Sequence, residues 1–173
     1  MPTVIKDGAI LPRDRWTVLR EATGPEVLQA VPGRSFIVPL EFWLNFRAQL
    51  EEYPGERGVW LDSHQTPEPI EADLAEFAVI GLNFPVFADG RSYSNARELR
   101  ERYQFEGEIR AIGDVMRDQL YYMSRCGFNS FALRHDQDPE TCLRALKDFS
   151  TGYQSSVDEP LPLFRRRGGV RQE

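Results

Sequence analysis

Cysteine and histidine are scarce in this chain of 173 residues, with two of each. Cys126 and Cys142 stand sixteen residues apart, and neither a Cys-x-x-Cys pair nor a Cys/His cluster occurs. Zinc sites and iron–sulfur clusters need such groupings of ligands, so neither metal centre can be assembled from this chain alone. We therefore predict two buried, reduced thiols, no metal site and no cofactor.

Motifs typical of several enzyme and membrane classes are also missing. The chain has no G-x-S-x-G elbow, no P-loop and no G-x-G-x-x-G fingerprint. No apolar run is long enough to span a bilayer, and the opening MPTVIKDGAI lacks the apolar region of a signal peptide. These features predict a soluble, cytoplasmic protein without a membrane partner.

Positive charge is in deficit overall, with a net charge of −6. Nucleic acid is therefore not expected as a partner, because phosphate binding needs a basic face. The distribution is uneven: residues 41–77 carry nine acidic residues and two arginines, whereas residues 91–134 carry eight arginines and six acidic residues. A small anion could bind in the arginine-rich half, although a solvated surface is the simpler explanation for any single arginine.

The hydrophobic pattern predicts an α/β fold built from four consecutive β-α units. Strands are expected at 58–62, 78–84, 109–113 and 130–134, and helices at 39–53, 69–77, 92–103, 115–126 and 139–153. Strands separated by single helices are normally parallel, with right-handed crossovers. The prediction is a parallel sheet that resembles half of a (β/α)-barrel or a small open sheet.

The remaining segments complete a single domain of residues 1–160. Residues 1–35 are predicted to be a β-rich lead-in to the core at 36–160, with a hairpin at Asp7-Gly8 and a further strand in RWTVL. This lead-in could supply an antiparallel edge to the sheet. Residues 161–173 are predicted to form an extended basic tail.

Candidate ligand-binding residues follow from the strand assignments. In parallel α/β folds, ligands bind beyond the carboxyl ends of the strands. The residues at those positions that could bind an anion or another ligand are Asp89, Arg91, Ser92, Tyr93, Asp114, Arg117 and Arg134.

Local structure offers an alternative explanation for several of these positions. Ser92 or Ser94 could cap the helix that follows, and Asp114 could cap the next helix with Arg117 reaching back to it. A carboxylate beside an arginine has a lowered pKa and is a weak general base, which favours ligand positioning over acid–base chemistry.

Three motifs together carry a family resemblance. They are FPxFxDGRxYSxAxxLRxR from Phe84, GDVxRDQ from Gly113 and RCGF from Arg125. With these motifs, residues 36–167 and the IKDG opening resemble the bacterial family called domain of unknown function 934. Its members carry a provisional label as oxidoreductases of sulfite reduction, because they are typically encoded beside the haem-containing subunit of assimilatory sulfite reductase.

The resemblance implies a role in sulfite reduction, which two hypotheses describe. In the first, the chain is an accessory protein that acts with the haem-containing sulfite reductase subunit in docking, assembly or electron-donor coupling. Its docking candidates are Leu161, Leu163, Phe164, Arg165 and Arg166. In the second, the half-barrel is a small enzyme or a module that binds a sulfur oxyanion through Arg91, Arg117 and Arg134. Whether the chain catalyses a reaction is left open.

Overall fold

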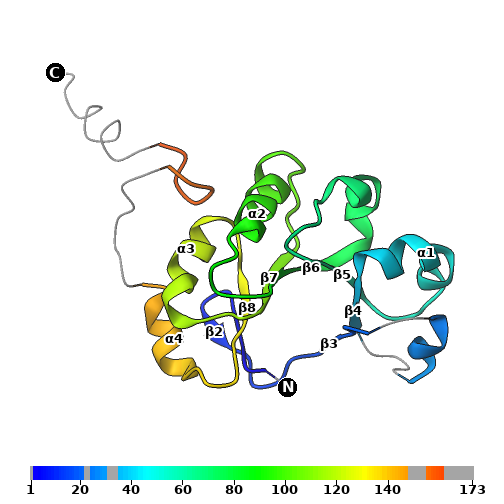
Figure 1. The fold of residues 1–173 in the computed structure, drawn as a ribbon, viewed down its shortest axis with the longest axis horizontal. Coiled ribbons are helices and arrows are strands. Elements are labelled where there is room, and N and C mark those ends of the chain that lie inside the picture. The colour runs from blue at the N-terminus through cyan, green and yellow to red at the C-terminus, as the bar shows by residue number, and fades with distance from the viewer. Residues whose placement is uncertain (1, 22–23, 31–34, 148–154, 162–173) are drawn as a thin grey trace.

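An eight-stranded, mostly parallel sheet curls into a half-barrel (Figure 1). The structure is a computed structural model and describes residues 2–21, 24–30, 35–147 and 155–161. Six strands are parallel and follow one another in chain order across the sheet: β3 (Trp16–Val18), β4 (Ser35–Pro39), β5 (Arg57–Leu61), β6 (Phe77–Phe84), β7 (Glu108–Gly113) and β8 (Ser130–Ala132). The predicted α/β class and half-barrel arrangement are confirmed.

Helices connect these strands along the outer, convex side of the sheet (Figure 1). They are η1 (Pro25–Ala30), α1 (Leu40–Glu51), η2 (Glu68–Glu76), α2 (Arg91–Glu101), η3 (Arg117–Gln119), α3 (Leu120–Arg125) and α4 (Pro139–Ala145). The helix predicted at 69–77 is a 3₁₀ helix, and the one predicted at 115–126 divides into η3 and α3. Among the described residues, no helix has the length and apolar character that crossing a bilayer requires.

The predicted hairpin at Asp7-Gly8 joins β1 (Val4–Lys6) to β2 (Ala9–Ile10). Both turn residues have positive φ, 49° and 76°, which suits Asp-Gly in a tight hairpin turn. β1 pairs antiparallel with β8, so the lead-in does supply an antiparallel edge.

The parallel part of the sheet has six strands rather than four. The RWTVL segment forms β3 at the opposite edge from β2, and the unpredicted β4 lies immediately before α1. Phe36, Ile37 and Val38 of β4 are all buried, so this strand has no polar face and no alternation to reveal it.

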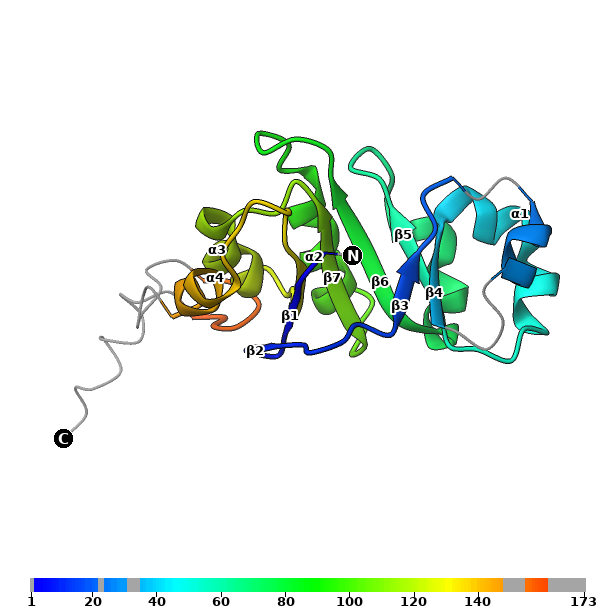
Figure 2. The ribbon, with the colours of Figure 1, turned by 90° about the horizontal axis from the view of Figure 1, so that it is seen from below.

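The two faces of the sheet have separate apolar clusters. Phe36 and Val38 pack in the main core under the helices, whereas Ile37 packs with Trp16 and Val79 on the concave face. Residues 11–15, called the strap here, join β2 to β3 and cross this concave side from one edge of the sheet to the other (Figure 2). The half-barrel is thus open on one side, apart from the strap.

Candidate functional site

The carboxyl ends of β6, β7 and β8 lie side by side, because these neighbouring strands are parallel. Asp89 and Arg91 follow β6, Asp114 follows β7, and Arg134 follows β8. The loops that carry these predicted site residues therefore leave the sheet at one edge, called the carboxyl rim here.

Arg91 and Asp89 form a bidentate ion pair in the loop before α2. The guanidinium donates from Nε and from a terminal nitrogen to the two carboxylate oxygens, at 3.0 and 2.7 Å. Arg91 also donates to the Ser63 hydroxyl at 2.9 Å, which ties this loop to the one after β5. Hydrogen bonds from Arg91 hold the pKa of Asp89 well below its usual range. The pair thus makes a rigid loop, and its carboxylate is ionised at neutral pH.

Ser92 does not cap α2. The cap position is Gly90, which has no side chain to cap the helix, and the Arg91 amide donates to the Asp89 carboxylate at 3.2 Å. The buried Ser92 hydroxyl instead donates to the Asn83 carbonyl at 2.7 Å, which fixes the start of the helix to the end of β6. A tertiary acceptor outcompeted the local capping role that the sequence predicted.

Asp114 also has a partner distant in sequence in place of the predicted cap. Its carboxylate accepts a hydrogen bond from Arg134 at 2.7 Å, and Arg134 also binds Asp136 at 2.6 Å. The hydrogen bonds that Arg134 donates to Asp136, and then to Asp114, raise its pKa above the ordinary value. The helical turn starts only at Arg117, which pairs with Asp118 at 3.0 Å.

Tyr93 packs into an aromatic cluster beside the rim. Its ring lies 5.1 Å from that of Phe84 and 5.0 Å from that of Tyr122, centroid to centroid. Burial raises its pKa to about 12, so the phenol is neutral at physiological pH. The contacts of Tyr93 are those of a packing residue that connects α2 to α3.

The structure joins the predicted residues in two separate pairs, Asp89 with Arg91 and Asp114 with Arg134. A pocket on the concave side includes Arg134 among its described lining residues, whereas Arg91 and Arg117 are not among them. Convergence of the three arginines on one anion therefore stays a prediction.

The rim also has a series of hydrogen-bonded polar residues, Arg20, Asn83 and Asp62, that the sequence did not predict as site residues. Asn83, at the end of β6, donates to Asp62 at 2.9 Å and accepts from Arg20 at 3.4 Å. Burial opposes ionisation of Asp62, but hydrogen bonds from Asn83 and the Ser63 amide outweigh it and lower its pKa. Arg20 directly follows the RWTVL strand, so the strand-end rule could have identified it.

Exposed apolar side chains gather where the rim meets α3. Val86, Phe87 and Tyr122, called the rim patch here, are exposed by 56%, 53% and 51%. The loop that carries Phe87 is held to η3 by a hydrogen bond from the Gln119 side chain to the Phe87 carbonyl, at 3.4 Å. Tyr122 follows Gln119 by one turn. The hydrogen bond thus places the loop of Val86 and Phe87 beside η3, which leads directly into the helix that carries Tyr122.

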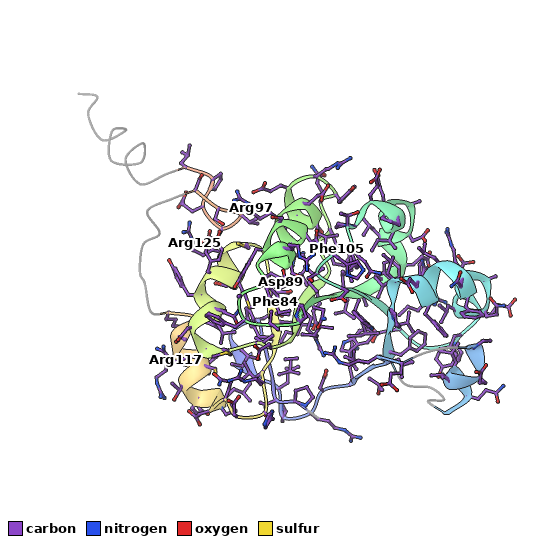
Figure 3. All side chains as sticks on the ribbon, in the orientation of Figure 1. Phe84, Asp89, Arg97, Phe105, Arg117 and Arg125 are labelled. Carbon is purple, nitrogen blue, oxygen red and sulfur yellow. The ribbon has the colours of Figure 1, made fainter. Side chains whose placement is uncertain are left out.

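One predicted docking residue, Leu161, is described. It is half exposed and ends segment 155–161, which lies beside Arg125 at the end of α3 (Figure 3). The Ser156 hydroxyl and the Val157 amide both donate to the Arg125 carbonyl. The other docking candidates, Leu163, Phe164, Arg165 and Arg166, lie outside the described residues.

Histidine, cysteine and acidic side chains are the residues that could supply the ligands of a metal ion. Within residues 2–21, 24–30, 35–147 and 155–161, no three of them are grouped so as to hold an ion. Both cysteines are buried and unpaired, as predicted.

Comparison with known proteins gives a family but no characterised relative. No curated protein matches the chain. Residues 58–164 match a family described as a bacterial protein of unknown function, DUF934. This stretch covers more than half of the chain and contains all three motifs that suggested the resemblance. The chain belongs to the DUF934 family.

Proposed function

We propose that this chain is an accessory protein of assimilatory sulfite reduction that docks on the haem-containing sulfite reductase subunit. The pathway comes from the family resemblance, and the rim patch supports a docking role. Exposed clusters of large apolar side chains commonly mark protein-binding surfaces, and aromatic residues are enriched at the centres of such interfaces.

Polar contacts also hold the loop of the rim patch in place, which favours binding. The Asp89–Arg91 pair and the bond from Arg91 to Ser63 fix the loop that presents Val86 and Phe87. A preformed surface loses less conformational entropy on association, so more of the contact energy appears as affinity.

The sulfur-oxyanion alternative has weaker support. Arg91, Arg117 and Arg134 each have a carboxylate partner within 3.0 Å. An incoming sulfite ion would have to compete with that carboxylate in each case, and displacing it would leave a charge without its partner.

Co-elution with the haem-containing subunit from the same bacterium tests the docking proposal. We expect the full chain to form a complex on size-exclusion chromatography. The double substitution Val86→Ser and Phe87→Ser should weaken binding about tenfold or more, because buried aromatic anchors carry most of an interface's energy.

Leu44→Ser is the matched control. Leu44 is 49% exposed on α1, at the far end of the molecule from the rim patch (Figure 1). Equal loss of binding in this variant, or no complex with the unaltered chain, would contradict the proposal. Leu163→Ala with Phe164→Ala tests the tail separately.

A further inference from the structure

A pocket of about 640 Å³ lies on the concave side of the half-barrel, away from the helices. Strands β3, β7 and β8 line it, together with Pro2 and Thr3. Small-molecule sites commonly have volumes of roughly 300–1,000 Å³. The pocket also reaches the carboxyl ends of these strands, where (β/α) proteins place their ligands.

Apolar side chains form one part of the lining. Ile112 and Ala132 belong to a small buried cluster on this face, and Val18 packs against it. Trp16 lines the pocket beside Val18 and is itself fixed by packing against Ile37. A ligand that fills this part must have an apolar body.

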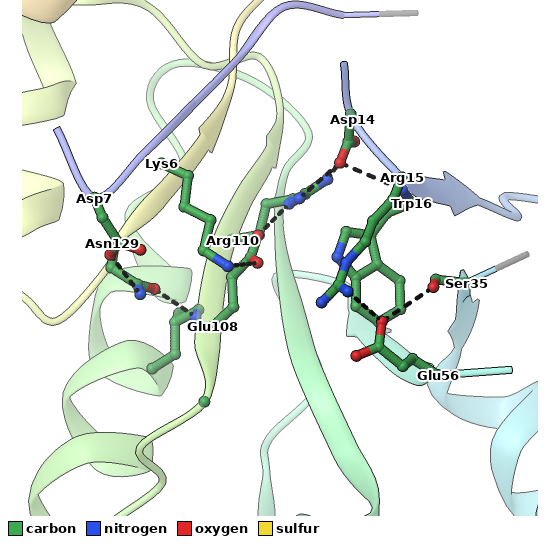
Figure 4. Close-up of polar contacts among 12 residues, drawn as sticks. Lys6, Asp7, Asp14, Arg15, Trp16, Ser35, Glu56, Glu108, Arg110 and Asn129 are labelled. Carbon is green, nitrogen blue, oxygen red and sulfur yellow. Dashed lines mark hydrogen bonds and ion pairs between the residues drawn. The ribbon is translucent and has the colours of Figure 1, made fainter. Parts of the chain in front are cut away.

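The charges at the base of the pocket neutralise one another. Arg110 is 1% exposed and binds both oxygens of Asp14 at 2.6 and 3.1 Å, and its Nε binds Glu108 at 2.7 Å (Figure 4). Lys6 completes the series with a 2.7 Å bridge to Glu108. Two cations thus face two anions, so this network fixes the strap and the pocket wall without attracting further charge.

Arg20 differs from the other two arginines of the lining. Its contacts within the described part of the chain are the neutral Asn83 amide oxygen and the face of Trp60, 5.8 Å from the ring centroid. Arg134, by contrast, has the carboxylates of Asp114 and Asp136. Arg20 is therefore the lining cation best able to bind an incoming anionic group.

We propose that this pocket binds a small organic anion, with its apolar body against Val18, Ile112 and Ala132 and its carboxylate or sulfonate on Arg20. An inorganic oxyanion would satisfy Arg20 but leave the apolar lining uncovered. This binding function is independent of the docking proposal, because the rim patch contributes no residue to the pocket lining.

A matched pair of fluorescent probes tests the proposal on the full chain. One is 1-anilinonaphthalene-8-sulfonate, and the other is N-phenyl-1-naphthylamine, which has the same apolar body without the charge. We expect saturable binding of both, with the sulfonate the tighter. Arg20→Gln should weaken sulfonate binding about tenfold and leave the neutral probe unchanged, since a charge-assisted contact contributes on that order.

The controls separate the pocket from other apolar surfaces. Arg20→Lys should retain most of the preference for the sulfonate, and the Val86→Ser, Phe87→Ser variant should bind both probes normally. Displacement by naphthalene-2-carboxylate compared with naphthalene-2-sulfonate identifies the preferred anionic group. Unchanged sulfonate affinity in Arg20→Gln, loss of binding in the rim variant, or equal displacement by sodium sulfite alone would each overturn the proposal.

Discussion

Glu108 is a buried charge on the concave face, and two neighbouring side chains make its burial possible. Glu108 is 5% exposed, yet it lies between two cations, Lys6 and Arg110. Burial raises the pKa of Glu108, but Arg110 and Lys6 outweigh it and bring the pKa below the ordinary 4.5. Removing one member of such a buried ion pair destabilises the folded state, because the remaining charges stay buried without a partner of opposite sign.

We predict that Glu108→Gln lowers the free energy of unfolding at pH 7 by about 3–5 kcal/mol, the usual cost of breaking a buried pair. The native pKa of Glu108 is lowered, so its contribution is present above pH 4.5 and is lost as the pH falls through the native value. Urea unfolding from pH 7 to pH 3 should therefore show the difference between the two proteins shrinking in acid.

Glu101→Gln is the control for that comparison. Glu101 forms a surface pair with Arg97, with both side chains at least 40% exposed. Such pairs contribute about 0–1 kcal/mol. A loss of stability in Glu108→Gln that is no larger than this, or that is constant with pH, would contradict the role given to Glu108.

At the scale of elements, the end of β7 needs a residue without a side chain. Gly113 has φ of 95°, and an added Cβ would lie 2.4 Å from the Phe84 carbonyl oxygen on β6. Gly8 has a similar φ of 76°, but an added Cβ there meets no atom within 4 Å. A side chain at Gly8 would therefore cause backbone strain alone, whereas a side chain at Gly113 would also collide with β6.

We expect Gly8→Ala to cost about 1 kcal/mol, from the left-handed conformation alone. Gly113→Ala should cost roughly 3 kcal/mol or more, because β6 and β7 must also separate at the rim. Thermal unfolding of both variants measures the difference. Equal costs would mean that the rim accommodates a methyl group without moving.

The elements that could be predicted from the sequence are those with local signals. The helix expected from residue 139 does begin at Pro139, and the preceding Asp138 carboxylate accepts from the Thr141 amide at 2.8 Å as a cap. Asp114 had the same local pattern, but Arg134 approaches from the next parallel strand and takes that carboxylate. A cap can be read from neighbouring residues, whereas a contact between strands depends on the fold.

The candidate site was predictable to the same limited extent. The loops at 89–93 and 113–117 were placed at the correct end of the strands by the parallel arrangement alone. The pairings Asp89–Arg91 and Arg117–Asp118 are local, but the sequence has no signal for the bond from Arg20 to Asn83. That contact needs β3 at the sheet edge, and β3 is only three residues long.

For the whole molecule, the strap holds the two edges of the curled sheet together. Its Asp14 reaches the buried Arg110 on β7, so the connection between β2 and β3 is fixed at its centre. We predict that Asp14→Ala speeds amide hydrogen exchange in residues 11–18 and lowers stability by a few kcal/mol, with the amides between β6 and β7 exchanging last.

Arg15→Ala provides the comparison, since Arg15 lies on the same strap and forms an exposed pair with Glu56. It should leave exchange in β3 near that of the unaltered chain. If both variants behave alike, the strap is not anchored through Asp14.

The pairing of β1 with β8 sets an order for folding during synthesis. Val4 is opposite Ala132, so the amino-terminal hairpin emerges from the ribosome long before the strand it hydrogen-bonds to. The strands between them can associate with their neighbours as each is completed, but the hairpin must wait. Contacts so distant along the chain slow folding, and an unpaired strand is prone to aggregation in the meantime. Strand β1 is thus synthesised well before β8 and is among the last strands to reach its native partner.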